Sequence, residues 1–391
     1  MKKLVVLVAG LLSVALFAQA EETQNTKENT FSMKVQIRPR AEYRNGVLFP
    51  RPKDAESTGF INNRARLSLG YERDRLSIGL SAQHVGVWGQ DLQIDKNGRF
   101  ILNEAWAKLD FGSGFFAKLG RQSLVYDDER IMGALDWNVA GRYHDALKLG
   151  YENTNNQLHL ILAFNQNDEK TIGGTYYAPG AQPYKTMQTL WYKHLFDKSF
   201  NASFLFMNLG MEGGDAEKQN SDTKYLQTLG TNLIYTPSHW TVGGTFYYQF
   251  GKTKSGRDVS AFLWAVNAAY QIDPQWKIGV GSDYLSGSDG ADGKYKAFDP
   301  LYGTHHKFYG AMDYFYASSF VNGLNPGLWD NQVNVAYKPS SKVNLSLAYH
   351  YFSITGDVYE GNDKLSKGLG SELDFQVDWV IMKDVKLSAG Y

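Results

Sequence analysis

Residues 34–44 read KVQIRPRAEYR, and this stretch decides the fold because its polar and apolar side chains alternate without a break. The polar members are Lys34, Gln36, Arg38, Arg40, Glu42 and Arg44, and the residues between them are Val35, Ile37, Pro39, Ala41 and Tyr43. A period of two is typical of a β-strand whose faces meet different surroundings. A charged face opposite an apolar face indicates a strand in the wall of a membrane pore.

The same alternation recurs along the chain. It is clear at residues 62–72, where Arg64 and Arg66 alternate with Ala65 and Leu67, and again at residues 372–379. We predict about 17 strands, at residues 31–45, 58–73, 75–90, 100–111, 114–125, 142–152, 156–166, 186–196, 199–210, 223–236, 239–251, 258–272, 275–286, 328–338, 342–356, 369–382 and 384–391. The predicted fold is therefore all-β, a transmembrane antiparallel β-barrel.

The predicted connections alternate in length. Those after even-numbered strands are short, as at Asp74, at Gly112 and Ser113, and at Lys383. Most of those after odd-numbered strands are long, at residues 46–57, 126–141, 167–185, 211–222, 287–327 and 357–368. Short periplasmic turns and long outer loops are typical of outer-membrane barrels, whose strand number is even in bacteria. We therefore expect about 18 strands in the complete protein and a last hairpin that is truncated in this chain.

Aromatic residues cluster beside the predicted short turns, on the apolar side of each strand. They are Tyr71, Phe111, Phe115, Tyr151, Phe196, Phe200, Tyr235, Trp240, Tyr270, Trp276, Tyr337 and Trp379. Aromatic belts mark the interfaces between a membrane and water. The pattern predicts an aromatic girdle at the periplasmic side of the barrel.

The first residues indicate export. Lys2 and Lys3 precede an apolar run from Leu4 to Phe17, and Ala18-Gln19-Ala20 provides small residues for cleavage. This is the pattern of a secretory signal peptide, and the run is too short for a membrane-spanning helix of about 20 residues. We expect residues 1–20 to be the signal peptide, residues 21–30 a short periplasmic segment and residues 31–391 the barrel. The expected location is the outer membrane of a Gram-negative cell.

The composition excludes several classes of function. The chain has no cysteine, so it has no disulfide and no thiolate metal site. It has 40 Lys and Arg against 40 Asp and Glu, which gives no overall field to attract nucleic acid. No cofactor is predicted. An electrostatic function must come from the local arrangement of charges.

Basic residues share the polar face of the early strands. They are Arg38, Arg40, Arg44, Arg64, Arg66, Lys108, Arg121, Arg142 and Lys148. Such a stripe indicates a constriction that passes anions, because the planar guanidinium fork binds carboxylates at two points and rings of basic side chains select anions. The alternative is a cross-strand ladder of ion pairs with interleaved acidic residues such as Glu42 and Glu104, which fills the wall without selecting a solute.

Two long connections carry many charged and aromatic residues, in segments 120–149 and 297–316. We expect at least one of them to fold inward and narrow the pore. The carboxylates of Asp127, Asp128 and Glu129 are interpreted as part of a solvated loop rather than as a site for a divalent cation. The pair His305 and His306 lacks the spacing of a zinc site, so no metal is predicted.

These two segments also resemble the alginate export family of outer-membrane barrels. The first resembles its GRQ, DER, DW and R-F/Y-D motifs, through Gly120-Arg121-Gln122, Asp128-Glu129-Arg130, Asp136-Trp137 and Arg142-Tyr143-His144-Asp145. The second is FDPLYGTHHKFYGAMDYF at residues 298–315, which includes Asp299, His305, His306 and Lys307. The resemblance covers most of the mature chain, although His144 replaces the usual phenylalanine. It implies an 18-stranded barrel with an electropositive constriction for an anionic uronate polysaccharide.

Three function classes follow from these observations. The first is a pore that passes anionic solutes or exports an anionic, alginate-like polysaccharide, and the second is a general diffusion porin with little selectivity. The third, a barrel enzyme, is disfavoured because the histidines form no recognisable dyad with a nucleophile. The expected partners are outer-membrane lipid, the anionic solute and periplasmic secretion proteins. We expect a monomeric barrel that binds no nucleic acid.

Overall fold

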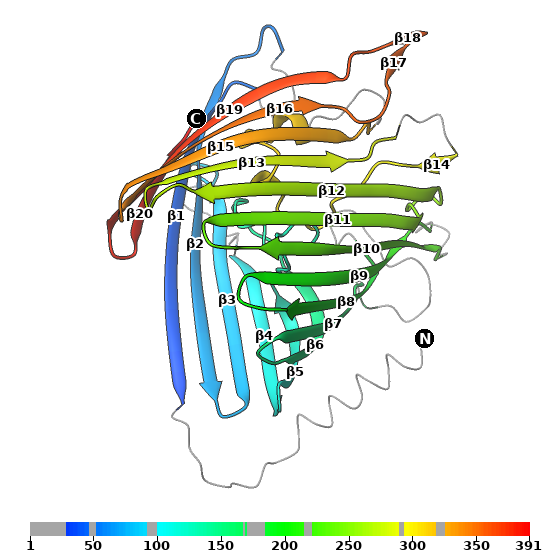
Figure 1. The fold of residues 1–391 in the computed structure, drawn as a ribbon. Coiled ribbons are helices and arrows are strands. Elements are labelled where there is room, and N and C mark those ends of the chain that lie inside the picture. Colours follow the sequence, from blue (N-terminus) through cyan, green and yellow to red (C-terminus); the bar gives the residue numbers. More distant parts are fainter. Residues whose placement is uncertain are drawn as a thin grey trace.

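The computed structural model describes residues 29–46, 52–91, 100–166, 169, 184–214, 221–288, 293–317 and 325–391. They form one large curved sheet (Figure 1). Its 17 long strands are β1 (Thr30–Arg44), β2 (Thr58–Arg73), β3 (Leu76–Val87), β4 (Phe100–Gly112), β5 (Phe115–Gln122), β6 (His144–Glu152), β7 (Asn156–Phe164), β8 (Thr186–Leu195), β9 (Phe200–Glu212), β10 (Thr223–Tyr235), β11 (Trp240–Lys252), β12 (Asp258–Gln271), β13 (Trp276–Leu285), β15 (Leu328–Ser340), β16 (Val343–Ser353), β19 (Gly368–Met382) and β20 (Val385–Gly390). The strands predicted from the sequence are thereby confirmed.

Consecutive long strands pair antiparallel, so the chain winds around the curve as a simple meander. The short β14 (Lys294–Tyr295) pairs parallel to the start of β12, and β13 therefore pairs with β15. The two-residue strands β17 (Tyr359–Glu360) and β18 (Asp363–Lys364) form a separate hairpin. Among the described residues, β1 pairs only with β2 and β20 only with β19, so the barrel is open between them. Pro39 lies in the edge strand β1, where a missing backbone donor is tolerated.

The short connections all lie at one end of the sheet, as the sequence analysis predicted. Asp74 between β2 and β3 and Asp384 between β19 and β20 have φ values of 46° and 64°. Positive φ values fit the tight turns whose twist matches antiparallel hairpins. The long connection at residues 123–143, which is described in full, therefore joins the opposite ends of β5 and β6.

The two faces of the sheet differ as the alternation predicts. On β1, the side chains of Val35 and Ile37 are 61% and 71% exposed and point away from the curve. The alternating Arg38 and Arg40 point inward, where they contact a loop. We call the face that contacts this loop the inner face and the other the outer face.

Aromatic residues pair across neighbouring strands beside the short turns. Their ring centroids lie 4.7 Å apart for Phe115 and Tyr151, 4.8 Å for Trp240 and Tyr270, and 4.2 Å for Trp276 and Tyr337. Such cross-strand pairs stabilise a sheet. The predicted aromatic girdle is thus a set of contacting rings on the outer face.

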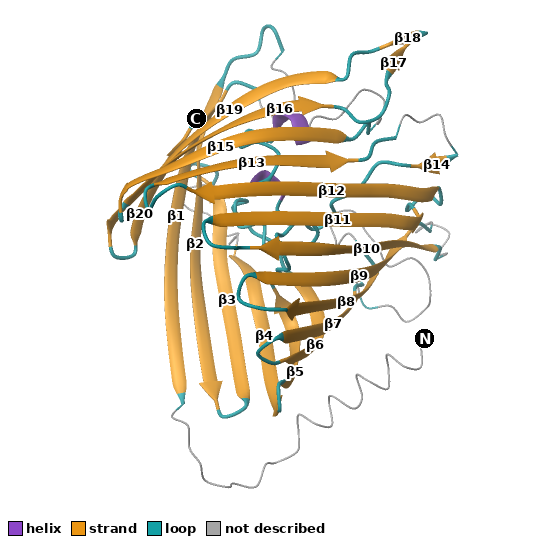
Figure 2. Cartoon of the chain, in the orientation of Figure 1, coloured by secondary structure: helices purple, strands orange, loops and turns teal. Residues whose placement is uncertain are grey.

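Two loops fill part of the curve. The first inward loop is residues 123–143, between β5 and β6, and the second inward loop is residues 296–317, which contains the 3-10 helix η1 (His305–Lys307) and the helix α2 (Tyr314–Ala317). The helices η1 and α2 of the second inward loop, purple in Figure 2, lie behind β12 to β16 within the curve. Leu124, Ile131 and Phe298 from these loops pack with inner-face residues such as Met207 and Leu263 in one apolar cluster. This cluster fixes the loops against β7 to β12.

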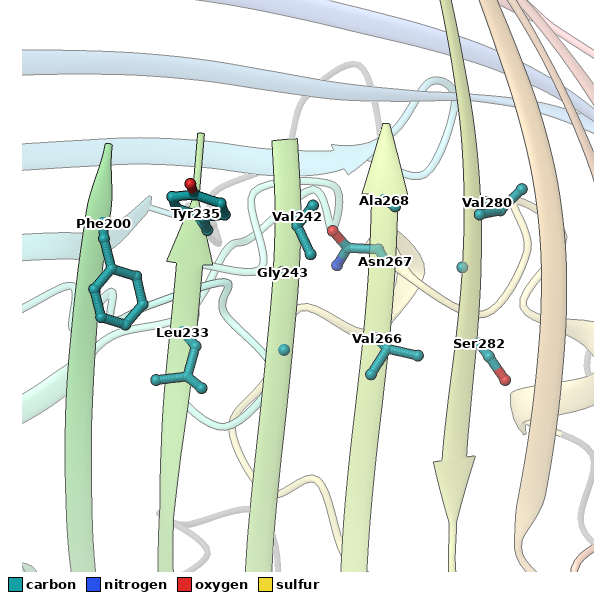
Figure 3. Close-up of a pocket in the computed structure, with 12 residues that line it drawn as sticks. Phe200, Leu233, Tyr235, Val242, Gly243, Val266, Asn267, Ala268, Val280 and Ser282 are labelled. Carbon is teal, nitrogen blue, oxygen red and sulfur yellow. The ribbon is translucent and has the colours of Figure 1, made fainter. Parts of the chain in front are cut away.

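The outer face carries a shallow apolar hollow of about 830 Å³ over β9 to β13 (Figure 3). Leu233, Val242, Val266 and Val280 line it, with Gly244 among the lining residues. A Cβ added at Gly244 would meet nothing within 4 Å, so the hollow is open beside this residue. The hollow is separate from the inner face, where the charged residues gather.

Among the residues that the structure describes, no helix has the length and apolar character needed to cross a bilayer. The expected signal peptide at residues 1–20 and most of the segment at residues 21–30 lie outside the described residues.

Candidate pore constriction

The two inward loops are held together along their backbones. Met132 and Tyr302 form a β-bridge, in which the Tyr302 N–H donates to the Ile131 carbonyl at 3.0 Å. The Gly133 N–H donates to the Tyr302 carbonyl at 2.9 Å. The Leu135 N–H also donates to Oγ1 of Thr304 at 3.1 Å. The structure therefore brings together two sequence motifs that lie about 170 residues apart in the chain.

The central charged residue of the first inward loop is Arg130, which is 4% exposed. Its Nε donates to the Asp128 carboxylate at 2.7 Å, and its Nη1 lies 2.5 Å from Oδ1 of Asp283 on β13. The guanidinium also lies 3.9 Å from the ring centroid of Phe308 in the second inward loop. Arg130 thus links both loops to the wall.

The neighbouring Asp127 attaches the first inward loop to β8 and β9. Its carboxylate accepts from Nε1 of Trp191 at 3.1 Å and from Oγ of Ser203 at 2.6 Å. Burial raises the pKa of Asp127, while these two donors oppose the rise. The sequence analysis placed Asp127 in a solvated loop, and this interpretation was wrong because the loop folds onto β8 and β9.

Glu129 ties the loops to each other. Its carboxylate accepts from Oγ1 of Thr304 at 2.8 Å and pairs with Nζ of Lys307 at 3.2 Å. At Asp299 the contact is through the backbone, because its carbonyl accepts from Nε2 of Gln249 on β11 at 2.7 Å. These residues of the predicted motifs link the two inward loops to each other and to β11.

Four carboxylates on β13, β15 and β19 form an acidic wall, which we define as Asp283, Asp330, Glu372 and Asp374. Glu372 accepts from the Met312 N–H at 2.8 Å and Asp374 from the Ala311 N–H at 3.0 Å, so the wall holds the second inward loop. Gly310 has a φ of 82° and packs against Glu372 so closely that a Cβ would collide with the carboxylate.

His350 on β16 lies among these carboxylates, with Nδ1 2.9 Å from Asp330. Glu372 and Asp374 fall in the alternating stretch at residues 372–379, to which the sequence analysis assigned no site. The alternation of residues 372–378 indicates that these carboxylates face the interior, but it contains no information about their contact with the second inward loop.

An arginine cluster, defined as Arg38, Arg40, Arg44, Arg64 and Arg66, lies on β1 and β2 at one edge of the open sheet. Asp136 of the first inward loop pairs with Arg38 at 3.2 Å and with the fully buried Arg64 at 2.8 Å. Its side chain is nonetheless 62% exposed. The predicted DW motif therefore sits against the predicted basic stripe.

Trp137 lies between two cationic or ionisable groups. The guanidinium of Arg40 is 4.3 Å from the ring centroid and donates to the Trp137 carbonyl at 2.6 Å. The His306 ring stacks on Trp137 at a centroid distance of 3.9 Å and an angle of 10°, and its Nδ1 lies 2.9 Å from Asp313. This stack forms the edge of the constriction beside the arginine cluster.

Of the remaining predicted basic residues, Arg44, Arg66, Lys108 and Lys148 lie on strands of the wall, and Arg142 lies at the end of the first inward loop. Arg44 pairs with Glu42 at 2.6 Å, and Arg66 donates to Gln83 at 2.8 Å. Arg142 donates to the Gly303 carbonyl at 2.8 Å, which joins the end of the first inward loop to the second. Lys108 and Lys148 lie on the inner faces of β4 and β6.

The structure corrects the placement of Arg121. It lies in phase with the exposed Leu119 on β5, whereas Lys118 and the fully buried Gln122 occupy the inner face. Its guanidinium pairs with Asp145 at 2.9 Å, directly across the strands, on the outer face. The alternation of β5 is indistinct in sequence because Ala117 and Gly120 are small, so Lys118 was missed and Arg121 was misplaced.

His305, one of the paired histidines, is packed within the second inward loop. Burial lowers its pKa to about 4, so the imidazole is neutral near pH 7. In the described part of the chain, no group of three His, Asp or Glu side chains has a geometry that could hold a metal ion.

Solved structures share this architecture. The chain is similar to OccAB4 of Acinetobacter baumannii, with a TM-score of 0.60, 12% identity, and coverage of 94% of this chain and 93% of that chain. It is similar to a BenF-like porin of Pseudomonas fluorescens, with a TM-score of 0.59, 12% identity and coverage of 93% of both chains. OpdQ of Pseudomonas aeruginosa gives a TM-score of 0.56 at 13% identity, again with 93% coverage of both. At this identity the likeness establishes the fold.

The curved meander, its apolar outer face and its loop-narrowed interior define a channel-forming β-barrel of the cell outer membrane, in contact with membrane lipid. The chain belongs to the alginate export family, whose model matches residues 31–391. No curated protein matches the sequence. The resemblance of the two loop motifs to this family is thereby confirmed.

Proposed function

We propose that the chain forms an anion-preferring channel without catalytic activity, and that it exports an acidic polysaccharide of the alginate type or passes smaller anions. The observation that carries this proposal is the arginine cluster. Among the described residues, its five guanidinium groups form ion pairs with only two carboxylates, those of Glu42 and Asp136. A surplus of positive charge beside a constriction favours anions.

The chemistry of arginine suits a carboxylate solute. The guanidinium presents a planar fork that carboxylates meet at two points, and it stays charged at every physiological pH. Arg38 and Arg40 retain side-chain exposures of 28% and 22% while they contact the first inward loop. A passing polymer would exchange water for such contacts one after another, and each contact must stay weak enough to release.

The acidic wall supports a second candidate, a general diffusion porin. Basic and acidic side chains on different strands of a pore wall create a transverse field rather than a filter for one sign of charge. In that case the channel would pass small solutes with little selectivity. The two candidates differ in the reversal potential that a salt gradient produces.

The test is a planar bilayer measurement under a KCl gradient, with an oligouronate then added. We expect wild-type channels to prefer anions and to be blocked by the oligouronate. The variant Arg38→Ala/Arg40→Ala/Arg64→Ala/Arg66→Ala should lose most of this preference. The milder Arg40→Gln/Arg44→Gln keeps the buried Arg64 in place and should lose part of it. Arg257→Gln, in the connection between β11 and β12, is a matched control that should change nothing.

Weak selectivity and no block in the wild type would support the general porin instead. Unchanged selectivity in both arginine variants would show that the cluster only stabilises the wall.

The proposal also takes residues 1–20 as a signal peptide, residues 21–30 as a periplasmic segment and the barrel as a monomer. Periplasmic secretion proteins would deliver a polymer to it.

A further inference from the structure

Three lysines lie side by side on the inner face, apart from the arginine cluster. Lys108 on β4 is directly opposite Lys118 on β5, and Lys118 is directly opposite Lys148 on β6. All three are partly buried. Residues directly opposite on one face have Cβ atoms about 4.5–5.5 Å apart, so the three stems start close together. We call these residues the lysine row.

The lysine row contacts aromatic rings. Nζ of Lys118 lies 3.7 Å from the ring centroid of Trp106, and Nζ of Lys108 lies 4.2 Å from that of Phe116. Lys148 is 5.7 Å from the Phe116 centroid. These rings orient the ammonium groups but do not neutralise them.

The nearest carboxylates on neighbouring positions are engaged elsewhere. Glu104 accepts from Nε1 of Trp106 at 3.2 Å and from the Ser123 N–H at 3.1 Å. Glu152 lies 2.8 Å from Nε2 of His159. Within the described ranges, none of the three ammonium groups forms an ion pair. Like charges directly opposite in a sheet are destabilising, so the row costs stability unless an anion lies on it.

The position of the row relative to the constriction is set by the strands. Lys108 and Lys148 lie four residues before the ends of β4 and β6, at Gly112 and Glu152, and Lys118 lies three residues after the start of β5. These ends join the short turns, which face the periplasm in an outer-membrane barrel. Arg64 lies nine residues from the corresponding end of β2. An anion from the periplasm therefore meets the lysine row before the arginine cluster.

We infer that Lys108, Lys118 and Lys148 form a separate binding site for a linear polyanion, which engages the chain at the periplasmic side before it reaches the constriction. Successive strands are about 4.8 Å apart, so the row offers three positive charges at that spacing. Ammonium groups are compact point charges without the fixed fork of arginine. The site thus selects for several linked negative charges and against a single one. The identity of the transported polyanion rests on the proposed function, whereas the site itself does not.

The test compares Lys108→Gln/Lys118→Gln/Lys148→Gln with the wild type and with Lys338→Gln/Lys342→Gln/Lys383→Gln, which removes the same charge near other short turns. An oligouronate is added to one side of a planar bilayer at a time, after the barrel orientation has been assigned by protease accessibility. We expect the blocking concentration from the short-turn side to rise about tenfold in the first variant only. Acetate should not block any of them.

A second readout does not depend on conduction. Tripolyphosphate should change the fluorescence of the wild type, and Trp106→Phe should remove that part of the response because Lys118 lies over Trp106. The triple lysine variant should fold, because it removes like charges, and should lose the response. Unchanged block together with an unchanged response would overturn the site. A wild type without anion preference that still shows the Trp106 response would refute the proposed function and keep the site.

Discussion

The acidic wall and the arginine cluster hold the inward loops in different ways: the acidic wall contacts both loops, and the arginine cluster contacts the first. The acidic wall uses buried contacts: Arg130 and Asp283 are each 3% exposed in their side chains where they pair. The arginine cluster uses backbone carbonyls and the carboxylate of Asp136, which remains 62% exposed. Buried charged pairs fix a geometry because the loss of one partner leaves an uncompensated charge, whereas exposed charges stay available to solutes.

This difference separates anchoring from selection. Carboxylates of the acidic wall contact Arg130 and the backbone N–H groups of Ala311 and Met312, so the wall is engaged with the inward loops. The arginine cluster has five guanidinium groups for the carboxylates of Glu42 and Asp136, and it contacts the first inward loop. We therefore expect stability to depend on the first region and ion selectivity on the second.

The largest effect should come from Asp283→Asn. It leaves Arg130 buried with Asp128 as its only carboxylate partner, so the free energy of unfolding should fall by about 3–5 kcal/mol. The loops should then separate from β13 and single-channel conductance should increase. Urea unfolding of the purified barrel and bilayer recording would measure the two effects.

The exposed pair of Lys252 and Asp258 at the rim provides the control for that change. Asp258→Asn should leave stability and conductance unaltered. The double variant Arg130→Met/Asp283→Asn should recover part of the stability, because no buried cation remains. If Asp283→Asn behaves like Asp258→Asn, the acidic wall is not the anchor.

A smaller effect should follow from Asp136→Asn. Loss of the carboxylate weakens the contacts with Arg38 and Arg64, which should cost about 1–3 kcal/mol of unfolding free energy. The same change exposes more uncompensated positive charge at the constriction, so anion preference should rise. Reversal potentials with Asn138→Ala as a loop control would check this, and a fall in anion preference would contradict the assignment of the arginine cluster.

The smallest effect should come from Arg121→Ala/Asp145→Ala. Both side chains lie on the outer face and are partly exposed, and exposed pairs contribute about 0–1 kcal/mol. Ion selectivity should not change at all, in contrast to the arginine variants of the inner face. A clear shift of the reversal potential would place Arg121 in the conduction path and reverse the correction made from the alternation of β5.

The strands could be predicted from local sequence because each strand has its own alternation of polar and apolar residues. The alternation of residues 34–44 contains both the secondary structure and the orientation of Arg38 and Arg40. The lengths of the connections then ordered the strands into a meander. The same reasoning failed at β5, where small residues weaken the contrast between the two faces and Arg121 was assigned to the wrong one.

The loops could be recognised but not arranged from sequence. Asp127 and Asp128 read as a solvated acidic cluster, yet one binds Trp191 and Ser203 and the other binds Arg130. Contacts between residues about 150 positions apart, such as those of Arg130 and Asp283, depend on the curvature of the whole sheet. The local periodicity of the sequence therefore gives no information about these long-range contacts.

The backbone bridge between the inward loops has a consequence for evolution and for engineering. Gly303 packs against the Arg130 carbonyl and Gly133 against Thr304 so closely that neither could carry a side chain without displacing the other loop. The two loops are therefore expected to change together in evolution, although they lie far apart in the sequence. A chimera that exchanges the constriction between members of the family should transplant residues 123–143 and 296–317 together, since either loop alone would meet a partner shaped for another sequence.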